Sequence, residues 1–404
     1  MANKSIFADA QNGLLRNLKP LDLIGFMQIL FDKYEEAEIA KFTPMMVDRY
    51  FTYNPVQMGL TAEALMGQYN FRVMASVLGN DSITPLRGTT GFSAWTHEIP
   101  RIGHKYPMEA SRLRQLYQVL ESVRTTDAAK IRQLQNTIFN NVQDAYLGCK
   151  DTLDYIFLRS IFHEGVVEFT TSFNNPQGPA SYKIDYLMPE ENKKISKDSS
   201  GNNLEWNAAN SAAGNLNIFE QLQDVVREMS DKGIVVGEMM MSPKMFVLIQ
   251  RDKVVRKMVY GSDRSSSLVT IPDLNAALTN YGLPPITQVT RRMAIEKDGK
   301  RSLVNPTMDN ADDSERIVFL PTGKLGEIQP SVEDSDLIPE ENVSYINSND
   351  GIKVSQWSVG DSTNQKPTEY TQAAGRLLPI ITEIKGIYSL KVTNLDNLDN
   401  LGEA

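Results

Sequence analysis

The chain has 404 residues, a formal net charge of −9 and a single cysteine. An apolar share of 41% and a charged share of 23% are ordinary for a globular protein, and the length allows about two or three domains. The negative charge argues against a nucleic-acid-binding protein, because tight binding to phosphates needs a surplus of lysine and arginine. One cysteine excludes internal disulfides, and no segment has the apolar core of a signal peptide or the roughly twenty apolar residues of a membrane span. We therefore expect a globular protein made and kept in the cytoplasm.

The amino-terminal quarter of the chain changes in composition near residue 42. Residues 7–39 are predicted to be helical in pieces, and LDLIGFMQILFDKYEEAEIAKF is the strongest segment. Residues 42–95 are rich in Gly, Pro, Asn and Thr, which favours short strands and long excursions. So long a loop-rich stretch is unusual inside a compact domain, so we expect an arm or loop that contacts another subunit. Its aromatic residues are Phe51, Tyr53, Tyr69, Phe71, Phe92 and Trp95.

The longest helical region is predicted to open at Pro107 and to continue to Gly165. Apolar residues recur at helix spacing in three runs, and the other face is polar, which is typical of a helix lying across a sheet. The segment 125–127 is either a break with a new N-cap or a kink. Cys149 falls on the apolar face and is expected to be a small buried residue.

The middle of the chain alternates between strands and helices. The segments VVEFTTSF and SYKIDYLM flank NNPQG and predict a hairpin. Residues 189–215 are polar and predicted to be a loop anchored by Trp206. Amphipathic patterns predict helices over 216–230 and 272–281.

The stretch VVGEMMMSPKMFVLIQRDKVVRKMVYG (235–261) predicts a strand, a sharp turn and one helix. Ser242 is a good N-cap, and Pro243 suits the first helical position. A nucleophile elbow would need glycine on both sides of the serine, but Met240 and Lys244 stand there. The turn also lacks the glycines of a phosphate-binding loop. Ser242 is therefore interpreted as a structural cap.

Two residue clusters in this stretch allow more than one interpretation. The basic cluster is a solvated face or a subunit contact against an acidic neighbour, with nucleic-acid binding as the third alternative. The methionines are interpreted as adaptable core residues rather than ligands. The basic cluster consists of Arg251, Lys253, Arg256 and Lys257, and the methionines are Met239, Met240, Met241 and Met245.

The carboxyl-terminal third is predicted to be mostly β. Residues 293–304 form a hairpin on Asp298-Gly299, a strong turn signal, and 316–328 form a strand, a Pro/Gly turn and a second strand. Residues 331–369 are a polar insertion, 377–392 are a last apolar strand pair, and the repetitive end 393–404 is expected to be mobile.

No local pattern of catalytic or metal-binding residues is present. His97, His104 and His163 have no zinc-binding spacing, and residues 309–315 (DNADDSE) lack the glycine and final glutamate of a calcium loop. We interpret 309–315 as a solvated loop. A carboxylate pair assembled by folding stays open, because it leaves little trace in sequence. The predicted catalytic, cofactor-binding and metal-binding residues are accordingly none, no cofactor is expected, and the protein is not predicted to be an enzyme.

The order of these elements resembles the major capsid proteins of tailed double-stranded DNA phages of the lambda type, with the Hong Kong phage-type capsid fold. The resemblance covers roughly residues 108–392 and is one of pattern and order. The segments that carry it are the long helix, the Trp206 loop leading into IFEQLQDVVREM, the strand–Ser-Pro–helix segment, IEKDGKRSLV followed by IVFLPTGKLGEI, and LLPIITEIKGIYSLKV.

The resemblance implies an α+β capsid fold and a division into named parts. Residues 1–58 would be an amino-terminal arm, 59–106 an extended loop, 107–215 a peripheral domain with the spine helix, and 216–367 an axial domain. Residues 368–404 would return to the peripheral domain and end in the mobile tail. The insertion 331–369 departs from the family pattern and leaves the outer edge of the axial domain open.

The implied function is self-assembly into hexamers and pentamers that form an icosahedral head shell around double-stranded DNA. The implied partners are other copies, a separate scaffolding protein, a portal protein and weakly, non-specifically contacted DNA, with decoration proteins left open and no membrane. Candidate DNA contacts are Arg112, Arg114, Lys130 and Arg132. The place of action would be the virion, after assembly in the host cytoplasm. The alternatives are a cytoplasmic α/β enzyme or another phage structural protein such as a tail-tube subunit.

Overall fold

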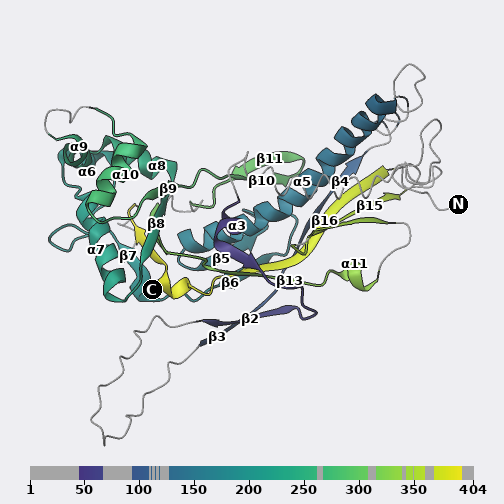
Figure 1. Ribbon diagram of the computed structural model, residues 1–404, viewed down its shortest axis with the longest axis horizontal. Helices are drawn as coiled ribbons and strands as arrows, with labels where there is room; N and C mark the ends of the chain where they lie inside the picture. Colours follow the sequence, from purple (N-terminus) through teal and green to yellow (C-terminus); the bar gives the residue numbers. More distant parts are fainter. Residues whose placement is uncertain are drawn as a thin grey trace, which may run out of the picture. The chain divides into compact units, whose positions relative to one another are not determined.

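The computed structural model describes residues 45–66, 93–108, 127–261, 267–307, 315–338, 343–348, 350–359 and 368–393, together with Ser111, Arg114 and Gln118 (Figure 1). Of residues 127–140 only the backbone is described. The chain divides into two compact units. Unit 1 contains residues up to 62, 96–154 and 327–380, and unit 2 contains residues 63–95, 155–326 and 381–404.

Unit 1 is built on a six-stranded sheet in the order β1-β13-β16-β15-β14, with β4 also paired to β16. The long strand β16 pairs antiparallel with β4, β13 and β15, so it is the centre of the sheet. The strands are β1 (Phe51–Tyr53), β4 (Arg101–Met108), β13 (Gly326–Ser331), β14 (Ser344–Asn347), β15 (Lys353–Val359) and β16 (Thr368–Ile380). The helices described in this unit are α3 (Met46–Tyr50), α11 (Asp334–Leu337) and the first part of α5 (Asp127–Phe162).

The long helix does not begin at Pro107, as the sequence had indicated. Pro107 lies in β4 opposite Tyr370 of β16, whereas Ser111, Arg114 and Gln118 are helical and α5 is described from Asp127 onward. All eight residues of β4 pair with β16, so the strand continues past Pro107 to Met108. The predicted break or kink at 125–127 falls mostly outside the described residues.

The segment 331–369 is a hairpin of the sheet rather than only a polar insertion. Strand β15 pairs with β14 on one side and β16 on the other. Its polar residues interrupt the apolar pattern by which a strand is recognised in sequence. They are accommodated in the sheet through hydrogen bonds to neighbouring strands, and the Gln356 amide donates to the Thr371 hydroxyl at 3.2 Å. Strands β13, β14 and β15 therefore share a sheet with β16.

Unit 2 is built on a five-stranded sheet in the order β7-β17-β12-β8-β9. Strand β12 is antiparallel to β8 and β17, whereas β7–β17 and β8–β9 are parallel pairs. The strands are β7 (Lys193–Ile195), β8 (Val236–Met241), β9 (Ile286–Gln288), β12 (Arg316–Pro321) and β17 (Tyr388–Lys391).

Helices and two hairpins complete unit 2. The helices are the end of α5, α6 (Ala208–Ala213), α7 (Ile218–Asp231), α8 (Pro243–Arg251), α9 (Lys253–Tyr260), α10 (Ile271–Asn280) and the short 3-10 turns Glu190–Asn192 and Ile384–Gly386. The hairpins are β5 (Val166–Thr170) with β6 (Ser181–Asp185), and β10 (Met293–Lys297) with β11 (Lys300–Val304). One further two-stranded sheet pairs β2 (Thr61–Met66) with β3 (Ser93–Glu98).

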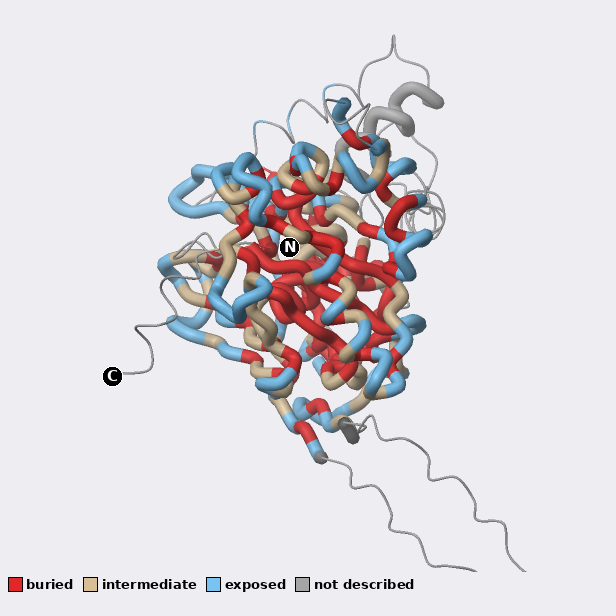
Figure 2. The backbone as a smooth tube through the Cα atoms, turned by 90° about the vertical axis from the view of Figure 1, so that its left-hand side faces the viewer, coloured by how far each residue is buried: buried red, intermediate tan, exposed pale blue. Residues whose placement is uncertain are grey.

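The core of unit 2 confirms several predictions. Figure 2 shows the buried stretches of the backbone gathered inside and the exposed stretches mostly on the outside. The amphipathic helix α7 buries its apolar stripe, and Trp206 is 1% exposed and anchors its loop as expected. The predicted hairpins β5–β6 and β10–β11 both form, and Asp298 and Gly299 supply the two positive φ angles of the second turn. The four methionines Met239, Met240, Met241 and Met245 are buried, as predicted for core residues.

Three predicted segments of unit 2 are wrong in detail. The single helix after Pro243 is two helices, because buried Asp252 ends α8 and caps α9 with its carboxylate. Residues 189–215 include β7, which pairs with β17, and α6, which Asn207 caps. The predicted strand pair 377–392 is β16 and β17, which join different sheets. Apolar runs show that a strand is buried, but they do not show which neighbour it pairs with.

The aromatic residues of the loop-rich segment are less exposed than predicted. Phe51 is 2% exposed and Trp95 is 4% exposed. The Trp95 ring stacks on Tyr186, and its indole N–H donates to the Asp185 carbonyl at 2.8 Å. These two rings are therefore buried within one chain. The prediction that the segment contacts another subunit is wrong for them. Tyr69, Phe71 and Phe92, like residues 7–39 and 394–404, lie outside the described residues.

Candidate functional site

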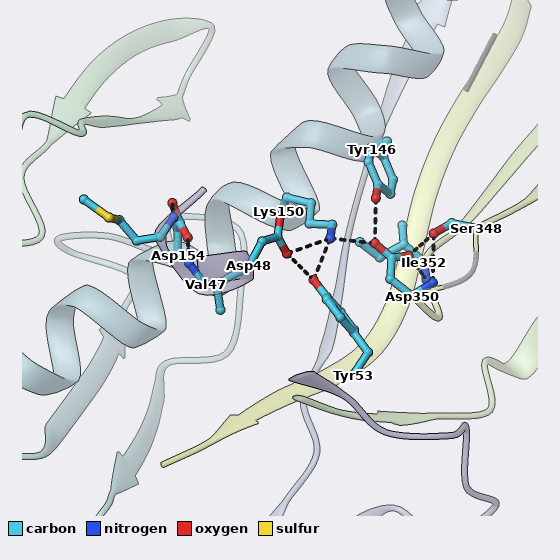
Figure 3. A network of polar contacts seen from close by, with 10 residues as sticks. Val47, Asp48, Tyr53, Tyr146, Lys150, Asp154, Ser348, Asp350 and Ile352 are labelled. Carbon is cyan, nitrogen blue, oxygen red and sulfur yellow. Dashed lines mark hydrogen bonds and ion pairs between the residues drawn. The ribbon is translucent and has the colours of Figure 1, made fainter. Parts of the chain in front are cut away.

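A buried polar network in unit 1 joins the start of the described chain to the long helix and to the sheet (Figure 3). At its centre the Lys150 ammonium lies 2.9 Å from an Asp350 carboxylate oxygen, 3.2 Å from Asp48 and 2.5 Å from the Tyr53 hydroxyl. The Tyr53 hydroxyl donates onward to Asp48 at 2.9 Å, and Tyr146 donates to Asp350 at 2.6 Å. Three separate stretches of sequence thus meet at one lysine.

The local structure fixes the direction of each of these side chains. Tyr146 and Lys150 are four residues apart on α5, so both point from the same face of the helix. Asp48 is on α3 and Tyr53 on β1. Asp350 is held in the turn between β14 and β15, where it accepts from the Ser348 hydroxyl and from the Ile352 amide at 3.2 Å.

The network keeps its lysine charged. Burial opposes the ammonium form of Lys150, but the charges of Asp350, Tyr53 and Asp48 and the hydrogen bond to Tyr53 outweigh it, so the pKa lies above the ordinary lysine value. Burial is also the main reason that the pKa of Tyr53 is raised. The side chains of Lys150 and Asp350 are only 7% and 5% exposed. A buried pair of this kind positions elements, because a partner left alone would be a costly unpaired charge.

A second buried carboxylate, Asp154, lies one helical turn further along α5. It accepts the backbone N–H of Val47 at 2.7 Å and that of Met46 at 3.2 Å, at the start of α3. Lys150 and Asp154 together hold α3 and β1 against α5 (Figure 3).

The chain after β1 then runs along β13 in a fixed, extended form. The amides of Asn54 and Gln57 donate to the Ile328 and Pro330 carbonyls at 2.9 and 3.1 Å, and the Val332 amide donates to Gln57 at 2.9 Å. The Gln57 side chain turns back to the chain and donates to the carbonyls of residues 59 and 61.

This extended segment exposes its apolar side chains, whereas the polar side chain of Gln57 is held by hydrogen bonds within the chain. The pattern is the reverse of an ordinary surface strand, and an ordered row of exposed apolar groups marks a contact surface. The row, which we call the 56–60 stripe, consists of Val56, Met58 and Leu60, exposed by 51%, 72% and 46%.

The stripe leads directly into the two-stranded β2–β3 sheet. The amide of Ile99, just after β3, donates to the Leu60 carbonyl at 2.7 Å, just before β2. Along the chain, the anchored segment α3–β1 is therefore followed by the exposed 56–60 stripe and then by the β2–β3 sheet.

The sequence matches no known family profile, and no curated protein is significantly similar to it. Solved structures are similar in fold. A prophage protein of Escherichia coli CFT073, provisionally named as a capsid protein, aligns with a TM-score of 0.50 at 13% identity, covering 91% of this chain and 99% of its own. The chain has the capsid fold of tailed phages.

Two further structures show the same kind of likeness. The capsid of Myoviridae phage XM1 aligns with a TM-score of 0.43 at 12% identity, covering 87% of this chain and 92% of its own. A phage-related protein of Bordetella bronchiseptica RB50 aligns with a TM-score of 0.43 at 11% identity, covering 92% of this chain and 97% of its own. The predicted α+β capsid fold is confirmed by the likeness to the Escherichia coli prophage protein, whereas the names and boundaries of the arm, loop, peripheral and axial domains stay predictions.

Within the capsid fold, Ser242 is the structural cap that the sequence indicated. Its hydroxyl accepts the Met245 amide at 3.3 Å, Pro243 begins α8, and the serine is 1% exposed. Cys149 is buried as predicted, and burial raises its pKa to about 12. Both residues serve packing and local structure.

The three histidines are dispersed. His97 contacts the Glu98 carbonyl, and His104 contacts the Ala145 carbonyl of α5 at 2.7 Å. His163 follows α5, where burial and the charges of Arg159 and Arg316 lower its pKa well below the ordinary value. Over the part of the chain that the structure describes, no group of three or more His, Cys, Asp or Glu side chains could hold a metal ion.

Two sets of predicted residues remain, the loop 309–315 and the candidate DNA contacts. Of the predicted solvated loop 309–315, only Glu315 is described, and it is fully buried, so that interpretation is wrong for this residue. Among the candidate DNA contacts Arg114 is exposed, and the side chains of Arg112, Lys130 and Arg132 lie outside the description. No described helix is long and apolar enough to cross a membrane.

Sequence reasoning missed the Lys150 network altogether. Its directly hydrogen-bonded members are separated by as many as 204 residues, as for Tyr146 and Asp350. One usable signal was present: a lysine on the apolar face of a helix, next to buried Cys149, needs a buried counter-charge.

Proposed function

We propose that this protein is the subunit of a phage head shell. The observation that supports the proposal best is the capsid fold over 91% of the chain. The anchored segment α3–β1 and the 56–60 stripe supply what a shell subunit needs, since they fix an extended contact surface on a rigid unit. The subunit would form hexamers and pentamers that enclose double-stranded DNA in an icosahedral shell.

The proposed partners follow from this role. The first partner is the protein itself, and the finished shell belongs to the virion. A separate scaffolding protein, a portal protein and assembly in the host cytoplasm are part of the proposal, with decoration proteins left open. The net charge of −9 supports a wall that packaged DNA touches only weakly.

Electron microscopy of the purified, concentrated protein tests the proposal. Closed shells or ring-shaped capsomers of this single chain are the expected result. Extended tubes would favour a tail-tube subunit, and particles that stay monomeric at every concentration would overturn the shell role.

A further inference from the structure

Helices α8 and α9 of unit 2 present a basic surface. Their cationic residues are exposed or half-buried, and the acid between residues 243 and 261 is Asp252, which is fully buried and accepts the amides of Val254 and Val255 at 2.9 Å. That carboxylate is occupied inside the protein and leaves the outer charge unopposed within these two helices. The set, called here the basic face, consists of Lys244, Arg251, Lys253, Arg256 and Lys257.

Exposed apolar side chains accompany the basic face. Tyr260, the last residue of α9, accepts the Thr270 amide at 3.3 Å and donates to Asp273 at 2.5 Å, which ties the start of α10 to the end of α9. Methionine and arginine are enriched at protein–protein interfaces, and exposed apolar groups beside the cations provide surface that a partner could bury. These groups are Val247, Met258, Leu268 and Ile271, which are exposed by 40%, 37%, 61% and 48%.

Helix α7 of the same unit carries the opposite charge. It has four carboxylates and one arginine, and the Arg227 guanidinium is bound to Asp224 at 2.8 Å. Positions 220, 224, 227 and 231 form one exposed stripe at helical spacing. The Glu228 carboxylate is already paired with the Lys194 ammonium at 2.7 Å, so the acidic face, as we call it here, consists of Glu220, Asp224 and Asp231.

The acidic face also has apolar neighbours. Tyr281 is 43% exposed and packs on Phe219 of α7 with ring centroids 5.1 Å apart, while the Gln223 amide donates to its carbonyl at 3.0 Å. Val235, which follows α7, is 67% exposed. Figure 1 shows α7 below the group of α8, α9 and α10, so the basic and acidic residues belong to different helices of one unit.

We propose that the basic face of one copy binds the acidic face of the next copy. The inference rests on the proposed shell function and specifies which surfaces of unit 2 meet. Two different, complementary surfaces on one chain give a head-to-tail contact, and such contacts close into a ring when the rotation between copies allows it. Opposite charges favour this pairing, and like charges disfavour basic-to-basic and acidic-to-acidic contacts.

Charge reversal on one face at a time tests the pairing. The first variant is Lys253→Glu with Lys257→Glu, and the second is Glu220→Lys with Asp231→Lys. In the second variant, replacing Glu220 removes a stabilising negative charge from the start of α7, and lysine at position 231 adds a stabilising positive charge at its end. The two effects on helix stability offset each other. Each variant alone should need an at least about tenfold higher concentration to associate, because the reversed positions repel the unchanged charges of the facing surface and the net attraction between the two faces falls.

Rescue separates a specific contact from general damage. A one-to-one mixture of the two variants, and a single chain carrying all four substitutions, should both associate again, because each sets the reversed positions of one face against the oppositely charged reversed positions of the other. The matched control is Lys297→Glu with Lys300→Glu on the exposed hairpin β10–β11, which should associate like the wild type. Sedimentation velocity gives the readout, and circular dichroism checks that each variant is folded.

The outcomes are distinct. If the wild type forms shells and both reversed variants do so equally well, the pairing is wrong while the shell function stands. The pairing is also overturned if the mixture of the two variants does not associate again. It is overturned as well if the first variant associates like the wild type and loses only its binding to duplex DNA. A wild type that never associates overturns the pairing and the shell function together.

Discussion

At the scale of single residues, Lys150 decides whether the buried network is neutralised. Replacing it by methionine keeps much of the volume but leaves the carboxylates of Asp350 and Asp48 facing each other without a cation. We expect Lys150→Met to lower the free energy of unfolding of the unassembled subunit by about 3–5 kcal/mol, the usual cost of breaking a buried ion pair. Urea unfolding measures this, with the exposed Lys297→Met as control. A loss no larger than that of the control would show that the network does not hold unit 1 together.

His163 makes the stability of the protein depend on pH. Burial and the cations Arg159 and Arg316 hold its folded-state pKa well below 6.5, so the folded protein keeps a neutral ring where the unfolded chain binds a proton. The contribution is therefore fully present above about pH 6.5 and is lost as the pH falls below that value, by at most about 1.4 kcal/mol per pH unit.

We expect the His163→Gln variant to lose less stability than the wild type between about pH 6.5 and pH 5.5, because glutamine does not titrate. Urea unfolding at several pH values gives the comparison. Parallel pH profiles for the two proteins would rule out His163 as the source.

At the scale of elements, Gly148 explains how β4 packs against α5. A Cβ at this position would lie 2.2 Å from Cε1 of the His104 ring, which contacts the Ala145 carbonyl at 2.7 Å. Gly148→Ala should therefore destabilise unit 1 by about 1–3 kcal/mol through overpacking, although alanine is the better helix former by about 1 kcal/mol.

A double-mutant cycle checks the cause. In a His104→Ala background the same Gly148→Ala change should be neutral or stabilising, because the ring is gone and the helix preference remains. Equal losses in both backgrounds would place the effect elsewhere. The glycine is thus a packing device between a strand and a helix.

At the scale of the whole molecule, we expect assembly to depend on the extension that β2 and β3 begin. Removing residues 67–92 and joining the two strands by a short turn leaves the 56–60 stripe and the Leu60–Ile99 hydrogen bond in place. The shortened chain should fold but form no closed shells, because the proposed subunit contacts of this segment are lost. Electron microscopy beside the full-length protein decides, and normal shells from the deletion would contradict the role.

Binding to DNA tests the charge of the whole chain. With a net charge of −9, the unassembled subunit should bind duplex weakly, without sequence preference, and less as salt rises, since each phosphate contact releases counterions. Titrations with two unrelated duplexes at low and at physiological salt measure this. Nanomolar binding that survives physiological salt would favour a nucleic-acid-binding role instead.

The elements differ in how far they could be predicted. Helix α7, the Ser242 cap and the Asp298-Gly299 turn were predicted correctly, because neighbouring residues determine each of them. The break at Asp252 was missed, although aspartate is a common N-cap, because the apolar pattern continues across it. None of the Lys150 network was predicted, since its partners come from three distant segments.

The sequence by itself determined the local elements, the ordinary core composition and, through the order of its elements, the resemblance to phage capsid proteins. Only the tertiary structure decided that β12 and β13, adjacent in sequence, join different sheets, and that β16 and β17 do the same. It also placed Asp48 and Asp350 on one lysine of α5. The reason is the range of the interactions: helix capping and turn geometry act over a few residues, whereas strand pairing and buried ion pairs form between residues that only the folded chain brings together.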